Sequence, residues 1–115
     1  MSALIKTFDV AIASGASQSG AVALGAAIPI GIEMPSVWTA ADLTLLASID
    51  DVNFSPVYND GGEELTITVG GAARYIALDQ SYFVGFASIK LRSGTFDAPV
   101  NQGGARTLKL VTKAF

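Results

Sequence analysis

Short runs in which apolar and polar residues alternate recur along the whole chain, separated by glycine, aspartate, asparagine and proline. Because side chains two positions apart lie on the same face of a strand, this pattern predicts short strands joined by hairpins and turns. There is no long helical pattern, so we expect about eight strands in an all-β fold, an antiparallel β-sandwich of the jelly-roll kind. The apolar positions expected to face the core are Phe8, Val10, Ile12, Val22, Leu24, Ile28, Ile30, Ile32, Met34, Leu43, Leu45, Ala47, Ile49, Leu65, Ile67, Val69, Ala87, Ile89, Leu91, Leu108 and Leu110.

The residues between these runs predict how the strands are connected. Asparagine, aspartate and glycine at 59–62 tolerate positive φ and predict a hairpin turn. Residues 39–42 are expected to form a single helical turn, and residues 79–82 a capped turn or a short helix. Pro29 has no N–H to donate to a sheet, so it predicts either an edge position or a bulge in its strand.

With 115 residues, the chain has the usual size of one domain, and residues 1–115 are expected to form a single sandwich. Only 15% of the residues are charged, against about 25% in an average globular domain. A surface so poor in charge is either rich in small alanine and glycine residues or partly covered by neighbouring molecules, and we expect some of both. Residues 1–7 carry Leu4 and Ile5 ahead of the core positions, so we expect an extended N-terminal arm that adds a strand to a neighbour's sheet.

The net charge is −3, and the seven basic residues are scattered along the chain. This distribution disfavours nucleic-acid binding and polybasic docking to a membrane. Residues 10–32 carry no charge, but their serines, glycines and Pro29 argue against a membrane span, and Asp9 interrupts the place of a signal-peptide core. We therefore expect an intracellularly made, soluble product. Lys90 and Arg92 are expected to line the outer, basic face of their strand.

The chain contains no histidine and no cysteine. This excludes the commonest general base, the Ser-His-Asp and Cys-His arrangements, and zinc–sulfur sites. Paired-carboxylate catalysis or a calcium site would have to use acids in the middle of the chain: Asp50, Asp51, Asp60, Glu63 and Glu64. Adjacent acids of an extended chain point to opposite sides, and the spacing does not match an EF-hand loop, so solvated strand ends are the better interpretation. We expect no enzymatic activity, no metal and no cofactor.

Aromatic residues raise an alternative from another functional class. Exposed on a sandwich, Trp38, Tyr58, Tyr75 and Tyr82 would stack on sugar rings, as in a carbohydrate-binding module. We favour the interpretation that Trp38 closes one end of the sandwich and that Tyr82, with Phe83, covers the other. Amphipathic rings commonly fill such corners.

Three stretches follow one another in an order typical of one protein family: residues 31–48 (GIEMPSVWTAADLTLLAS), 73–95 (ARYIALDQSYFVGFASIKLRSGT) and 99–113 (PVNQGGARTLKLVTK). In these stretches the chain resembles small virion structural proteins from the head and tail gene clusters of tailed bacteriophages and phage-like gene transfer agents. The resemblance extends over about residues 12–113. It implies a virion component with a β-sandwich fold, and its motifs are turns and corners rather than a catalytic signature.

The resemblance leads us to expect a capsid decoration, cement or head-spike protein that binds the major capsid protein and resides in the virion. A tail or adaptor component is the alternative within the same class. We expect a homo-oligomer, and a trimer would suit the local three-fold axes of a shell. The residues expected to make contacts, from the first strand and the loop tips, are Leu4, Ile5, Phe8, Trp38, Asn59, Asp60, Tyr82, Asn101 and Gln102.

Overall fold

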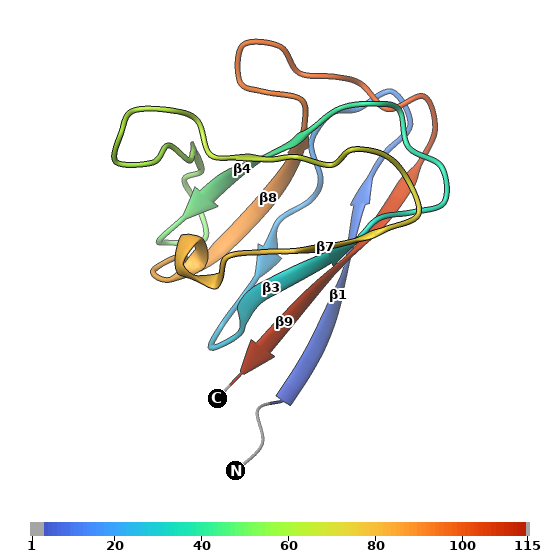
Figure 1. Cartoon of the computed structure of the whole chain (residues 1–115). Coiled ribbons are helices and arrows are strands. Elements are labelled where there is room, and N and C mark those ends of the chain that lie inside the picture. Colours follow the sequence, from blue (N-terminus) through green and yellow to red (C-terminus); the bar gives the residue numbers. More distant parts are fainter. Residues whose placement is uncertain (1–3, 115) are drawn as a thin grey trace.

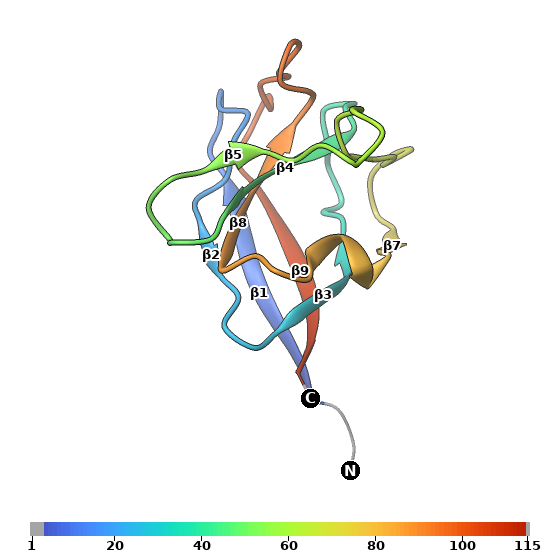
Figure 2. The ribbon, with the colours of Figure 1, turned by 90° about the vertical axis from the view of Figure 1, so that its left-hand side faces the viewer.

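The computed structural model describes residues 4–114, which form two antiparallel sheets packed face to face (Figure 1). Sheet A has the strand order β1-β9-β3-β7, and sheet B has the order β2-β8-β4-β5, with β6 also paired to β4. In Figure 2, β4 and β8 of sheet B lie nearer the viewer than β1 and β9 of sheet A. The prediction of an all-β sandwich is confirmed. The elements are β1 (Leu4–Ile12), β2 (Val22–Ala23), β3 (Ile28–Glu33), β4 (Leu43–Ser48), β5 (Ser55–Pro56), β6 (Thr66–Ile67), β7 (Tyr75–Ala77), η1 (Gln80–Phe83), β8 (Ser88–Ser93) and β9 (Arg106–Ala114).

The strands pair in a nested order. The first strand pairs with the last, the second with the eighth, the third with the seventh and the fourth with the sixth. Further pairs join β3 to β9 and β4 to β8, so that each set of strands forms one continuous sheet. The longest pair, β1 with β9, extends past the other strands at the end where β1 begins and β9 ends (Figure 1).

The core lies between the two sheets and consists of aliphatic side chains with one phenylalanine and one methionine. Alternation predicted most of these positions, because each strand of a two-layer sandwich buries one of its two faces. Buried side chains come from every strand except the short edge strands β5 and β7. They are Val10, Ile12, Val22, Leu24, Ile32, Met34, Leu43, Leu45, Leu65, Ile67, Val69, Phe83, Ile89, Leu91, Leu108 and Leu110.

Ile49 departs from the predicted core. The strand β4 ends at Ser48, and the chain then turns through Asp51, whose φ of 63° lies in the left-handed region. Ile49 is consequently 82% exposed. The prediction that Ile49 faces inward was therefore wrong, because an alternating pattern does not mark where a strand stops.

The helical predictions are partly confirmed. Asp79 caps the 3-10 helix η1 by accepting a hydrogen bond from Ser81 N, as the prediction of a capped short helix required. Residues 39–42 do not form a helical turn. Asp42 instead accepts hydrogen bonds from Val69 N and Gly94 N, so its acceptor groups bond to segments distant in sequence. Among residues 4–114, no helix is long and apolar enough to cross a membrane.

Pro29 lies at a bulge, which was one of its two predicted positions. The pairing of β3 with β9 shifts register between Pro29 and Gly31. Pro29 is buried and lies opposite the buried Thr112, although β3 is flanked on both sides by other strands. A bulge lets an interior strand accept a residue without an N–H, because one position is left out of the regular ladder.

The predicted basic outer face of β8 is largely covered. The Arg92 side chain is only 4% exposed, and its Nη2 lies 2.6 Å from Glu64 Oε2. The Arg92 guanidinium lies 5.7 Å from the Phe96 ring centroid, and Lys90 Nζ lies 4.5 Å from that of Phe54. The prediction of an exposed Arg92 was wrong, because the Glu64 carboxylate, distant in sequence, and the nearby Phe96 ring cover its side chain.

Candidate interaction surface

Three of the predicted contact residues lie on β1. Leu4 and Ile5 are 72% and 61% exposed, whereas Phe8 is half-buried, with Lys6 Nζ 4.8 Å from its ring centroid. Leu4 to Thr7 pair with β9, so this part of the expected arm is an edge strand rather than a free extension. Residues 1–3 of that arm lie outside the described residues.

The aromatic candidates divide by burial. Trp38 is half-buried against the core, and its Nε1 donates a hydrogen bond to Ala41 O at 3.0 Å. This placement agrees with its interpretation as a residue that closes one end of the sandwich. Tyr58, Tyr75 and Tyr82 are each about half exposed, and Tyr82 lies on η1 beside the buried Phe83.

The turn at 59–62 stabilises itself. Asn59 Oδ1 accepts hydrogen bonds from Gly61 N and Glu63 N, and Gly62 adopts a φ of 84°. This confirms the predicted hairpin turn and leaves Asp60 exposed at its tip. Within the part of the chain that the structure describes, no three acidic side chains converge to hold a metal ion.

Gln102 is buried, in contrast to its neighbour Asn101, which is exposed. The Gln102 side chain accepts from Thr39 N at 2.8 Å and from Arg106 Nε at 3.1 Å. It donates to Ser93 Oγ at 2.7 Å and to Thr39 O at 3.0 Å. Gln102 thus joins three chain segments from inside, while Asn101 remains available on the surface.

Exposed apolar side chains gather where β4 ends and β8 begins. Ala87 N donates to Ser48 O at 2.8 Å, which holds the two adjoining loops together. One loop presents Ile49 and Val52, which are 82% and 76% exposed. The other presents Val84 and Phe86, of which Val84 is exposed and Phe86 half-buried. We call Ile49, Val52, Val84 and Phe86 the apolar end of the molecule.

A groove of about 510 Å³ opens beside Ile49 and Phe86 and is continued by Pro56, Val57 and Tyr58. Its only charged lining residue is Asp50, whose carboxylate is already occupied. The groove therefore offers an apolar floor with few polar groups free to orient a small ligand.

Asp50 shapes the loop that presents Ile49 and Val52. Its carboxylate accepts from the N–H groups of Asn53 and Val52, from the Asn53 side chain and from Ser48 Oγ, at 2.8–2.9 Å. These hydrogen bonds, led by that from Asn53 N, hold the pKa of Asp50 well below its usual value of 3.8. A loop tied by four hydrogen bonds loses little further conformational freedom on binding, which favours a contact role.

The outer face of sheet A carries a row of charges that balance one another. Lys109 Nζ lies 2.9 Å from Asp9 Oδ1 on the neighbouring strand, and Glu33 is the cross-strand partner on the other side. The hydrogen bond to Asp9, then the charges of Asp9 and Glu33, raise the pKa of Lys109.

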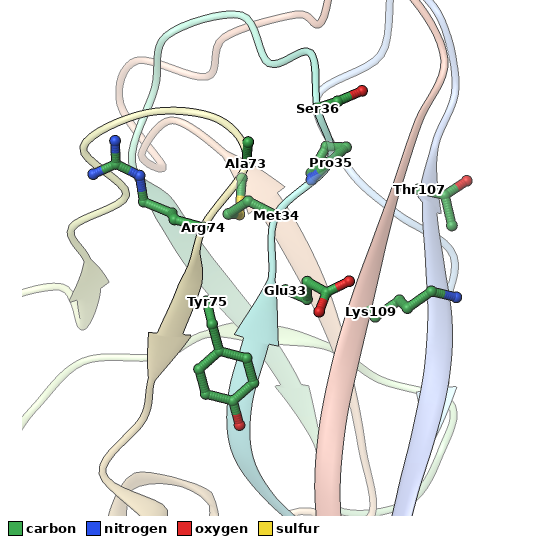
Figure 3. Close-up of a pocket in the computed structure, with 9 residues that line it drawn as sticks. All are labelled: Glu33, Met34, Pro35, Ser36, Ala73, Arg74, Tyr75, Thr107 and Lys109. Atoms are coloured by element: carbon green, nitrogen blue, oxygen red, sulfur yellow. The ribbon is translucent and has the colours of Figure 1, made fainter.

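The row ends at Tyr75, whose hydroxyl occupies the space above Gly31. A groove of about 490 Å³ runs along Glu33, Tyr75 and Lys109, with Arg74 at its rim pointing away from Lys109 (Figure 3). The residues that line the groove include no histidine or cysteine, and no three acidic side chains converge there.

Sequence reasoning missed the apolar end. Asp50 and Asp51 directly follow Ile49 and were expected to end its strand, but they do not show that the strand already stops at Ser48. Comparisons with protein-family models, with curated proteins and with solved structures each found no match for this chain. The functional proposal therefore depends on the sequence motifs and on the surfaces described above.

Proposed function

We propose that this chain is a structural protein of a tailed-bacteriophage virion, where it decorates or cements the capsid, or forms part of a head spike, by binding the major capsid protein. The observation that carries the proposal is the apolar end, formed by Ile49, Val52, Val84 and Phe86 on two adjoining loops. Contiguous exposed apolar groups mark protein-binding surfaces. The low charge of the chain supports the same role, because few charges need to be desolvated on contact.

The nested strand pairing supports a finer description of the sandwich as a jelly roll. In this pairing the first strand joins the last, the second joins the eighth and the third joins the seventh. The same order results when one long hairpin is folded into two sheets. Jelly rolls serve in viral capsid proteins and also in lectins. The fold therefore agrees with a virion role without requiring it.

The proposal is tested by mass spectrometry of purified virions washed in high salt. We expect this chain to remain with the particle, and its complete absence would overturn the proposal. Copy number relative to the major capsid protein distinguishes the positions within the virion. Hundreds of copies indicate shell decoration, whereas a few indicate a spike, or the tail or adaptor role that is our alternative.

For the carbohydrate-binding alternative, Tyr58 is one of three half-exposed tyrosines and lies beside the 510 Å³ groove. Two polar side chains of the same groove, Asp50 and Asn53, are hydrogen-bonded to each other, which leaves fewer of their polar atoms to bind sugar hydroxyls. A glycan array probed with the wild type and with Tyr58→Ala separates the alternatives. Binding that is lost in Tyr58→Ala would favour a lectin-like module.

A further inference from the structure

The edges of the two sheets differ in how well they are protected. An open strand edge presents unpaired N–H and C=O groups, and proteins blunt such edges by making them short or by placing proline in them. The edge strands β2, β5 and β6 have two residues each and β7 has three, and β5 contains Pro56. The remaining edge strand, β1, has nine residues, so it is the one long edge among the described residues.

The free side of β1 is open along most of its length. Its register with β9 runs without a shift from Leu4 to Ile12, and the strand contains neither glycine nor proline. On the free side, Ile12 forms a single bridge with Ser19, so Leu4 to Ala11 form the available stretch. A regular edge of this length is suited to accept another strand.

We propose that two copies of this chain pair through their β1 edges, antiparallel and about a two-fold axis at Thr7. In this register Thr7 lies opposite Thr7 of the second copy, Lys6 opposite Phe8, and Leu4 opposite Val10. The two four-stranded sheets A then form one continuous sheet across the dimer. In a two-fold contact the same strand faces its own copy, so β1 must be complementary to itself. Among the registers with the axis at Lys6, Thr7 or Phe8, only the one at Thr7 meets this requirement.

Complementarity follows from contacts that the single chain already makes. Lys6 Nζ lies 4.8 Å from the Phe8 ring centroid, and the proposed register gives each Lys6 a second Phe8 ring as its cross-strand neighbour. Leu4, which is 72% exposed in the single chain, lies opposite Val10, whose side chain is already buried at 2% exposure, so the pairing at this position is made by the backbone.

The neighbouring registers are less favourable. Residues directly opposite each other in antiparallel strands have their side chains on the same face of the sheet. A two-fold axis perpendicular to the sheet must therefore pass between one residue and its own copy in the second chain. An axis at Lys6 places two lysines directly opposite each other, which is destabilising. An axis at Phe8 places Leu4 against Ile12, whose free side is already bridged by Ser19. An axis at Thr7 avoids both conflicts.

The dimer concerns the chain alone and is independent of the proposed place in a virion. A chain that dimerises in solution but is absent from virions would overturn the proposed function and leave the dimer intact. A monomeric chain found on virions would overturn the dimer and leave the proposed function intact.

Disulfide trapping tests the register. The chain has no cysteine, so a Thr7→Cys variant carries a single thiol. Residues directly opposite each other in antiparallel strands have Cα atoms about 4.5–5.5 Å apart, within the range that a disulfide spans. We expect mild oxidation to convert Thr7→Cys into a covalent dimer on a non-reducing gel.

Ile5→Cys is the matched control. In the proposed register Ile5 lies opposite Asp9, so the two introduced thiols are four residues apart along the strands, roughly 13 Å. We expect it to remain uncrosslinked. Absence of the Thr7→Cys dimer, or equal crosslinking of both variants, would overturn the register.

Charge insertion tests the contact itself. We expect Leu4→Lys to raise the dimer dissociation constant at least about tenfold, measured by sedimentation equilibrium, because the added ammonium would lose part of its hydration when a second strand covers this edge. Val37→Lys adds the same charge at another exposed apolar side chain, 60% against 72%, outside both β1 and the apolar end, and should leave dissociation unchanged. Unfolding curves verify that both variants fold. A wild type that is monomeric at every concentration, a trimer, or equal effects of the two substitutions would contradict the proposal.

Discussion

Arg92 and Lys109 each pair with a carboxylate, but the two pairs differ sharply in burial. The Arg92 and Glu64 side chains are 4% and 13% exposed, and Glu64 also accepts from Phe96 N. Arg92 Nε donates to Thr44 Oγ1, so its charge is enclosed by polar partners. Lys109 and Asp9 are instead largely solvated. A buried charge that loses its partner is costly, whereas a solvated one is rehydrated.

We therefore expect Glu64→Gln to lower the free energy of unfolding by about 3 kcal/mol, because a nearly isosteric amide leaves the Arg92 charge buried without a counter-ion. Asp9→Asn makes the same chemical change in the exposed pair and should produce no resolvable loss. Urea denaturation of the two variants and the wild type measures the difference. Equal effects would show that burial does not govern these pairs.

The depressed pKa of Asp50 predicts a pH dependence of stability. Hydrogen bonds from Asn53, Val52 and Ser48 favour the ionised carboxylate in the folded chain. The corresponding stabilisation is fully present above the usual aspartate pKa of 3.8 and is lost as pH falls below that value toward the folded-state pKa. Asp50→Asn removes this titration. We expect the melting temperature of the wild type to fall more steeply than that of Asp50→Asn between about pH 5 and pH 2; parallel curves would contradict this assignment.

At the scale of elements, the turn that follows β8 depends on one glycine. Gly94 has a φ of 89°, its N–H donates to Asp42 O, and its carbonyl accepts from Thr44 Oγ1. A Cβ at this position would lie 2.5 Å from Ala98 O and 2.6 Å from Val100 N, both of them backbone atoms that cannot rotate away. The turn is thus closed by a residue without a side chain.

We expect Gly94→Ala to destabilise the chain by about 2 kcal/mol, since it adds a backbone clash to an unfavourable φ. Gly20→Ala is the control, because a Cβ there meets no atom within 4 Å. Thermal unfolding of both variants measures the contrast. A Gly94→Ala variant as stable as Gly20→Ala would show that the turn has another accessible conformation.

At the scale of the whole molecule, the wrapping of the strands decides which loops meet. It places the loop after β4 beside the loop before β8, and this creates the apolar end. We expect the double substitution Ile49→Ser with Val52→Ser to lower occupancy on virions about tenfold or more, since each buried aliphatic side chain is worth about 1.5–3 kcal/mol.

The control for that experiment is Val37→Ser, which alters an exposed valine beyond the end of β3. Quantitative mass spectrometry of virions assembled with each variant gives the occupancy. Equal occupancy for the double variant and for Val37→Ser would show that the capsid contact does not involve the apolar end. Because the altered side chains are exposed, the unfolding curves should remain close to that of the wild type.

Local patterns in the sequence determined the strands, most of their buried faces, the turn at 59–62 and the cap at Asp79. These features depend on the period of a strand and on the chemistry of a few neighbouring residues, so they can be read without knowing the partners. Only the tertiary structure decided that Arg92 and Gln102 are buried, that Ile49 is exposed, and that β1 is the long open edge. The burial of Arg92 and Gln102 depends on segments distant in sequence, on Glu64 for Arg92 and on Thr39 for Gln102, whereas the exposure of Ile49 depends on where β4 ends. Alternation assigns a residue to a face of a strand, but what covers that face is settled only when the sheets are wrapped.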